Sequence, residues 1–344
     1  MRSTPVTIRT RTAPEPSDLA AQLASRVVGQ PAAVESIVPY VTMYQAGLSP
    51  EGRPVGVFLL LGPTGTGKTR TVEALAESLH GTSRHVLRVD CGEFQMEHEV
   101  AKLIGAPPGY LGHRETHPLL TQAKLNAVTS DRSSLSIVLF DEIEKAAASL
   151  TRLLLGVLDR ATLRLGDNTT VNFEGSLIFL TSNLGAREMF RELNRGFGFG
   201  GMLPPEAGAS QRLEAIAMSA VRRRFSPEFV NRIDASITYY PLTDASLEAI
   251  LDLHLEQLQS HIVSRLGPRA FRIELTQEAR RFLLERGASR EFGARQLKRI
   301  IHKHLTQPLA ALVAAGRVEP TSRVKADAGP EALKFTCRRA ELAA

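Results

Sequence analysis

The sequence has few cysteines, and their spacing makes them neither metal ligands nor cross-links. Its 344 residues contain two cysteines, Cys91 and Cys337, which lie far apart. A disulfide framework or a structural zinc site needs more cysteines at closer spacing. We therefore expect two free thiols in a reducing compartment, since a chain of this length can bury a core without such cross-links.

Long apolar runs are also missing. No stretch approaches the ~18 consecutive apolar residues of a membrane-spanning helix, and the N-terminal end lacks the apolar core of a secretion signal. Residues 1–12 carry three arginines and no acidic residue, as transit peptides do, but early prolines and the lack of an amphipathic helix argue against that reading. We expect a cytoplasmic protein with no membrane partner, and a flexible tail over residues 1–17.

Charge of one sign does not dominate either. The 42 Lys and Arg residues against 36 Asp and Glu residues give a net charge of +6. The basic residues are dispersed, and the densest cluster, Arg222–Arg224, is too short for a DNA-binding arm. This charge permits nucleic-acid binding but does not demand it, and nucleic acid is not an expected partner. The composition is that of a globular protein, and the length suits two domains or one large domain with an appendage.

Apolar runs of strand length recur through the first part of the chain. They are unbroken rather than alternating, which is typical of parallel strands buried on both faces. The runs are Val55–Leu61, Val86–Asp90, Leu135–Phe140, Leu177–Thr181 and Ile237–Tyr240. Helical patterns lie between them, as at Thr69–His80 and Leu150–Ala161, and Ser17 or Asp18 can cap a helix that ends at Arg26. We predict a doubly wound α/β domain over residues 18–241.

The pattern changes after residue 241, where we predict a smaller, mainly helical domain over residues 242–344 with short strands. The expected elements are a helix at Asp244–Arg265, a strand at Phe271–Leu275, a helix capped by Thr276, a helix at Ala294–Ala315, and strands at Ser322–Ala326 and Leu333–Arg338. Residues 194–211 are rich in glycine, proline and alanine, which predicts a loop.

A phosphate-binding loop follows the first predicted strand. The pattern G-x-x-x-x-G-K-[ST] is matched by Gly62, Pro63, Thr64, Gly65, Thr66, Gly67, Lys68 and Thr69. Glycines let backbone N–H groups surround an anion, and the following helix points its positive end at the phosphates. We expect Lys68 to reach the β and γ phosphates of ATP and Thr69 to bind Mg²⁺.

Two adjacent carboxylates end the third predicted strand. Asp141 and Glu142 follow an apolar run, and neighbouring residues on a strand point in opposite directions. The two acids can therefore do different work. We expect Asp141 to reach the Mg²⁺ shell and Glu142 to act as the general base for the attacking water.

These motifs stand in an order that resembles the AAA+ superfamily, and within it the second ATPase module of the Clp unfoldases. The resemblance covers about residues 26–315. It rests on Arg26–Gln30, Ala46–Leu48, the phosphate loop, Gly105–Gly112 (pore loop), Asp141–Ala146 (Walker B), Thr181–Gly185 (sensor 1), Phe225–Asp234 (arginine finger) and Gly293–Arg299 (sensor 2). It implies a P-loop AAA+ sheet domain with a helical lid domain, binding ATP and Mg²⁺ in a homo-oligomeric, hexameric ring.

The resemblance also assigns roles around the nucleotide. Val27 and Val28 would line the adenine pocket, and Asn183 would hold the attacking water. Arg232 would enter a neighbouring subunit's ATP site as an arginine finger, an effect that contributes ~10³–10⁵ in turnover in other ATPases. Arg295 would contact the same phosphate from the lid. From pattern alone, an ion pair of Arg232 with Asp234 is the alternative.

Two loops bear on what the protein acts on. Gly109, Tyr110, Leu111 and Gly112 resemble the pore loop, where a bulky aromatic on a flexible loop can grip polypeptide of any sequence; the alternative is a buried core tyrosine. Phe197, Gly198 and Phe199 resemble a docking tripeptide for a ClpP-like peptidase, or else fold back on the body. The stretch after Gly112 departs from the family pattern, so grip can differ.

The function expected from this sequence is ATP-driven unfolding or disaggregation of unfolded or tagged proteins, threaded through a ring. An AAA+ motor or loader acting on nucleic acid or on a dedicated protein complex is the second candidate. A nucleotide-gated scaffold is the third, and the complete set of Glu142, Asn183, Arg232 and Arg295 disfavours it because a scaffold needs no hydrolysis.

Overall fold

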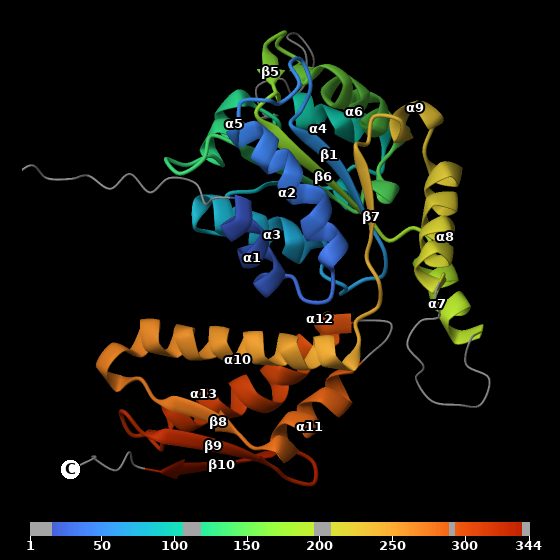
Figure 1. Ribbon diagram of the computed structural model, residues 1–344. Helices are drawn as coiled ribbons and strands as arrows, with labels where there is room; N and C mark the ends of the chain where they lie inside the picture. The colour runs from blue at the N-terminus through green and yellow to red at the C-terminus, as the bar shows by residue number, and fades with distance from the viewer. Residues whose placement is uncertain (1–15, 106–117, 196–207, 289–292, 339–344) are drawn as a thin grey trace, which may run out of the picture. The chain divides into compact units, whose positions relative to one another are not determined.

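The computed structural model describes residues 16–105, 118–195, 208–288 and 293–338 (Figure 1). Internal contacts divide the chain into two compact units. Unit 1 comprises Met1–Gly62 and Gly67–Tyr239, and unit 2 comprises Pro63–Thr66 and Tyr240–Ala344. Within the described ranges, no helix is both long and apolar enough to cross a membrane.

Unit 1 is built on a parallel sheet of five strands in the order β2-β3-β6-β1-β7. The strands are β1 (Gly56–Leu61), β2 (Leu87–Asp90), β3 (Ser136–Asp141), β6 (Ser176–Ser182) and β7 (Ala235–Thr238). Every residue of β1 and β6 is buried, as expected for strands covered on both faces. The predicted doubly wound parallel sheet is confirmed, although β7 begins and ends two residues before the predicted run.

Helices α1 (Pro16–Arg26), α2 (Pro31–Gln45) and α3 (Lys68–His80) lie together over the sheet (Figure 1). Their apolar side chains form one core with alternate strand residues such as Phe58, Leu60 and Phe179. The predicted helix cap at Ser17 or Asp18 is wrong, because α1 already begins at Pro16. Proline is well tolerated in a first turn, where its missing N–H has no intrahelical partner to lose.

The remaining described elements of unit 1 include four longer helices and one hairpin. They are α5 (Gln122–Ala127), α6 (Ala148–Arg160), α7 (Ala186–Arg195), α8 (Ala209–Arg224), and the hairpin of β4 (Thr162–Arg164) with β5 (Thr170–Asn172). Shorter turns of helix are η1 (Cys91–Glu93), η2 (Glu97–Val100), α4 (Ala101–Ile104), η3 (Ile143–Lys145) and α9 (Pro227–Val230). The hairpin was not predicted.

Unit 2 combines helices with a three-stranded sheet of order β10-β9-β8. Its elements are α10 (Asp244–Leu266), η4 (Gly267–Arg269), β8 (Arg272–Leu275), α11 (Gln277–Gly287), α12 (Gly293–Ile301), the π-helical turn η5 (His302–Thr306), α13 (Gln307–Ala314), β9 (Arg323–Ala328) and β10 (Leu333–Arg338). The predicted Thr276 cap is confirmed, since its hydroxyl accepts from Ala279 N at 3.1 Å. The long predicted helix at 294–315 is present with a π-helical turn inside it.

Candidate functional site

The phosphate loop joins β1 to α3, and its glycines have different tasks. Gly62 has φ +138°, and a Cβ there would lie 2.4 Å from the carbonyl oxygen of Tyr239. Gly67 has φ +108°, and a Cβ there would meet no atom within 4 Å. The first glycine is therefore required by packing, whereas the second leaves open space at the start of α3. The positive end of that 13-residue helix faces this space, and a helix N-terminus favours an anion such as phosphate.

Lys68 lies buried at the first position of α3, with 8% of its surface exposed. Its ammonium group donates to Gly62 O at 2.6 Å and to Asn183 Oδ1 at 2.9 Å. A buried ammonium is costly unless its charge is compensated. A phosphate arriving at the loop would therefore meet a cation that has already lost most of its water.

The tip of the loop, Pro63–Thr66, belongs to unit 2 by its contacts. The hydroxyl of Thr66 donates to Pro63 O at 2.8 Å, which tightens the tip. The N–H of Ala294, at the start of α12, donates to Gly65 O at 3.0 Å. Arg295 is the next residue, and its contact with a phosphate stays a prediction.

The two carboxylates at the end of β3 are fixed by β6, the next strand in the sheet. The hydroxyl of Thr181 donates to Asp141 Oδ1 and accepts from Glu142 N at 3.0 Å, so one side chain holds both acids. Glu142 has φ +57°, a left-handed conformation that is costly for a residue with a side chain. Such strain persists where the surroundings enforce it, and it is typical of functional sites.

A chain of polar contacts connects Glu142 to the phosphate loop. Asn183, directly after β6, donates from Nδ2 to Glu142 Oε1 at 3.2 Å and accepts from Lys68 at its own Oδ1. Only this orientation of the amide satisfies both partners, because the lysine can only donate and the carboxylate can only accept. The geometry thus brings together Lys68, Asn183 and Glu142, three residues predicted from separate motifs.

Lys145 and Glu144 belong to the same cluster and were not predicted. Lys145 forms an ion pair with Glu142 Oε2, and this hydrogen bond raises the pKa of Lys145. Glu144 accepts from Asn183 N at 3.0 Å through Oε1, while its Oε2 is buried without a hydrogen-bond partner among the described residues. The position of both residues on the turn after Asp141 was the available signal in the sequence.

Thr69 and Asp141 are the oxygen donors predicted for Mg²⁺, a hard cation that prefers oxygen. Within the described ranges, no group of three or more His, Cys, Asp or Glu residues could hold a metal ion alone. A Mg²⁺ bound mainly through phosphate oxygens and water needs no such group. The residues present therefore fit a metal that arrives with the nucleotide.

Arg232 follows α9, and the alternative that we considered for it is wrong. Its guanidinium contacts Asp159 Oδ1 of α6 at 2.7 Å rather than Asp234. Asp234 instead accepts from Val57 N at 2.8 Å and pairs with Arg53 at 3.3 Å. The Arg232 side chain keeps 38% of its surface exposed, so it can exchange Asp159 for another anion.

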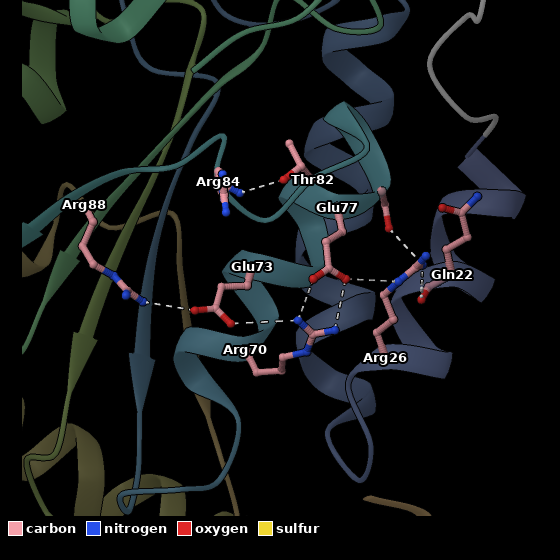
Figure 2. A network of polar contacts seen from close by, with 9 residues as sticks. Gln22, Arg26, Arg70, Glu73, Glu77, Thr82, Arg84 and Arg88 are labelled. Atoms are coloured by element: carbon pink, nitrogen blue, oxygen red, sulfur yellow. Dashed lines mark hydrogen bonds and ion pairs between the residues drawn. The ribbon is translucent and has the colours of Figure 1, made fainter. Parts of the chain in front are cut away.

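A ladder of charged residues connects α3 to α1 and β2 (Figure 2). Arg70 makes a two-pronged contact with Glu77 at 2.8 and 3.1 Å, and Arg26 approaches the same carboxylate at 3.5 Å. Glu73 pairs with Arg88 of β2 at 3.4 Å and with Arg70 at 3.9 Å. The ladder fixes the end of α1 against α3. The segment predicted to line the adenine pocket follows directly, with Val27 buried and Val28 partly exposed.

Two sets of predicted residues lie outside the described ranges. These are the pore-loop residues Gly109, Tyr110, Leu111 and Gly112, and the docking residues Phe197, Gly198 and Phe199. Their roles stay predictions.

Comparison with known proteins connects this geometry to one family. Residues 53–236 match the family described as "AAA domain (Cdc48 subfamily)", and residues 242–326 match the "C-terminal, D2-small domain, of ClpB protein". The chain is 37% identical over 317 residues to a "Chaperone protein ClpB" of Meiothermus ruber and 38% identical over 317 residues to that of Rhizobium meliloti. These matches cover 92% and 91% of the chain but 34% of each relative, so the chain spans about a third of their length.

Solved structures give the same result. Two structures of Hsp104 with casein, one from S. cerevisiae in its extended conformation and one in a closed state with ATPγS, each superpose with a TM-score of 0.78 at 27% identity. They cover 94–96% of this chain, which in turn covers 52–53% of theirs. The parallel sheet with its helical second domain is therefore the arrangement of elements found in those proteins.

Proposed function

The chain belongs to the AAA family and carries the small domain of the second ClpB module, and from this premise we propose that it is an ATP-driven motor that unfolds or disaggregates proteins by threading them through a ring. The observation that carries the proposal is the contact chain from Lys68 through Asn183 to Glu142. It links the group that would bind the γ phosphate to the group that would activate water.

The chemistry follows from these contacts. Lys68 and the N–H groups of the loop bind the β and γ phosphates, while Thr69 and Asp141 would hold Mg²⁺, which neutralises phosphate charge. Asn183 orients Glu142 and the attacking water. The Glu142 carboxylate, whose Oε2 must first leave Lys145, takes the proton from that water as it attacks the γ phosphorus. The bond from that phosphorus to the bridging oxygen breaks, and ADP is the leaving group.

The ring part of the proposal assigns Arg232 to the neighbouring subunit's ATP. Arg232 is partly exposed and pairs with Asp159, a singly charged partner at the end of α6. A terminal phosphate, with its higher charge and three oxygens, is the stronger partner. We expect a hexamer of identical chains. Arg295, a residue of unit 2, would contact the same phosphate as Arg232.

Polypeptide is the proposed substrate. The relatives are named as chaperones, and both Hsp104 structures are named as complexes with casein. Tyr110, an aromatic between two glycines, would grip a passing chain through apolar contact that does not depend on sequence. Nucleic acid or a dedicated protein complex is the competing substrate. A pore that threads nucleic acid would be expected to carry basic residues, which bind its phosphate backbone, in place of Tyr110.

One set of measurements tests the proposal. The wild-type chain should hydrolyse ATP and unfold a tagged fluorescent reporter, with ATPase stimulation by unfolded casein. Glu142→Gln should bind ATP and turn it over at least ~10²-fold more slowly, because the base is lost. Tyr110→Ala should hydrolyse ATP but not unfold the reporter. Stimulation by single-stranded DNA and not by casein would favour the competing substrate, and equal unfolding by Tyr110→Ala would refute the grip.

Two finer points stay predictions. Docking on a ClpP-like peptidase through Phe197–Phe199 has no support from the relatives, which are named as chaperones. A cytoplasmic location fits the reducing environment expected for Cys91 and Cys337, both free thiols in the structure.

A further inference from the structure

Arg224, the last residue of α8, binds the turn that carries Glu142. Its Nε donates to Glu144 O at 2.9 Å and its Nη2 donates to Ala146 O at 2.7 Å. A guanidinium presents its donors in a rigid planar fork, and hydrogen bonds from a charged donor are stronger than neutral ones. Arg224 therefore fixes the backbone immediately after the general base from the α8 side.

The turn needs such a restraint. Glu142 has φ +57°, a conformation that persists only when its surroundings enforce it. On the β6 side, the restraint comes from Thr181 and Asn183. Arg224 supplies a second restraint from a different element. A shift of about 1 Å in a reacting group can reduce a rate by ~10²-fold, so the position of this backbone matters for hydrolysis.

The other end of the same segment carries Arg232. From Arg224 the chain passes through Phe225 and α9, and the buried rings of Phe225 and Phe229 stack at 5.1 Å with 27° between their planes. This packing joins the end of α8 to α9. Arg232 is in turn held by Asp159 near the end of α6, a helix that starts shortly after the turn. The turn and the finger are thus connected by two routes.

We propose that Arg224 is a positioning residue that couples the Glu142 turn to the segment bearing Arg232. The inference rests on the proposed function, in which Glu142 acts on a subunit's own ATP and Arg232 on its neighbour's. When Arg232 exchanges Asp159 for the neighbour's terminal phosphate, α9 and the end of α8 move with it. Arg224 carries this movement to Glu144 and Ala146, and so resets Glu142. An open surface pocket of about 350 Å³, lined by Asn183 and Arg224 among others, lies beside this contact.

The test uses the full chain in its assembled form and compares Arg224→Ala, Arg224→Lys and the control Arg222→Ala. Arg222 is exposed on the same helix, so its replacement removes the same charge away from the turn. We expect Arg224→Ala to lower kcat about tenfold or more with KM for ATP within about twofold, because binding groups are untouched. Its Hill coefficient for ATP should fall to one. Arg224→Lys should be intermediate, because one ammonium group cannot bind both carbonyls as the fork does.

A double variant separates positioning from general damage. If Arg224 acts through Glu142, then adding Arg224→Ala to Glu142→Gln lowers the residual rate no further. A further drop in that background, a kcat equal to that of Arg222→Ala, or a Hill coefficient that matches a cooperative wild type would each overturn the inference. A wild type with a Hill coefficient of one overturns the coupling as well. A wild type that does not hydrolyse ATP refutes the proposed function itself, which keeps the two failures distinct.

Discussion

Unit 1 holds two polar clusters of similar composition that are built in opposite ways. In the ladder of Figure 2, each carboxylate of α3 lies between arginines, and the central pair makes a two-pronged contact. In the cluster at the end of β3, Glu142 adopts a left-handed backbone and Glu144 keeps one buried oxygen without a partner among the described residues. The charged groups of the ladder are paired, whereas the cluster at the end of β3 keeps a strained backbone and, within the described ranges, an unpartnered oxygen.

The difference agrees with the roles proposed for the two clusters. An unsatisfied buried oxygen and a costly φ angle lower stability, and natural proteins keep them where a function depends on them. Ion pairs on a helix surface, in which each charge has a partner, stabilise the local structure modestly and take no part in a reaction. Substitutions should therefore separate activity from stability according to the cluster in which they fall.

The largest effect is expected from Asn183→Ala. This change removes the amide that bridges Lys68 and Glu142. We therefore expect kcat to fall by about 10²-fold, as it does when other single polar groups that stabilise a transition state are removed. The free energy of unfolding should change by no more than about 1 kcal/mol, because the lost bonds are few and partly exposed. Steady-state ATPase rates and a denaturant titration measure both quantities. A fully active variant would remove Asn183 from the proposed mechanism.

A moderate effect is expected from Glu77→Gln in the ladder. Without the carboxylate, Arg26 and Arg70 face each other across an amide, and we expect the free energy of unfolding to fall by about 1 kcal/mol. The ATPase kcat should stay within about twofold. Glu73→Gln is the matched control on the same helix, and its longer contacts of 3.4 and 3.9 Å predict a smaller loss. A large drop in kcat for Glu77→Gln with unchanged stability would contradict the division between the clusters.

The smallest effect concerns His80, at the end of the helix that bears the ladder. Burial, and to a lesser extent His85 stacked on it at 5.2 Å, lowers the pKa of His80 to about 4. The unfolded chain has a histidine pKa of about 6.5, so between those values it binds more protons than the folded chain. Stability should therefore fall as pH drops from about 6.5 to about 4. Replacing His80 with Gln should flatten this dependence, measured as the denaturant midpoint at each pH; an unchanged slope would rule His80 out.

The sequence was sufficient for features that depend on local order along the chain. The unbroken apolar runs predicted the strands because strands covered on both faces have no polar side. Lys68, Glu142 and Asn183 could be placed together because the carboxyl ends of adjacent parallel strands meet at one edge of the sheet. Helix α2 was missed, since Pro39 lies inside its otherwise apolar pattern.

Contacts between distant segments could not be predicted in this way. The pairing of Arg232 with Asp159 depends on how α6 and α9 pack. The sequence of neither helix indicates that it packs near the other. The same holds for Arg224, whose partners are carbonyl groups that every residue carries. A side chain that binds backbone groups has no partner of a particular residue type, so the sequence does not indicate the contact.

The close packing of Gly62 against Tyr239 connects the phosphate loop to the end of unit 1. Tyr239 is the last residue of unit 1; its N–H donates to Leu61 O at 2.7 Å and its hydroxyl to Thr71 Oγ1 at 2.7 Å. The peptide by which the chain leaves for unit 2 is therefore anchored on both sides of the nucleotide loop. A rearrangement of that loop that displaces Leu61 or Thr71 would therefore also displace Tyr239, the residue at which the chain leaves unit 1.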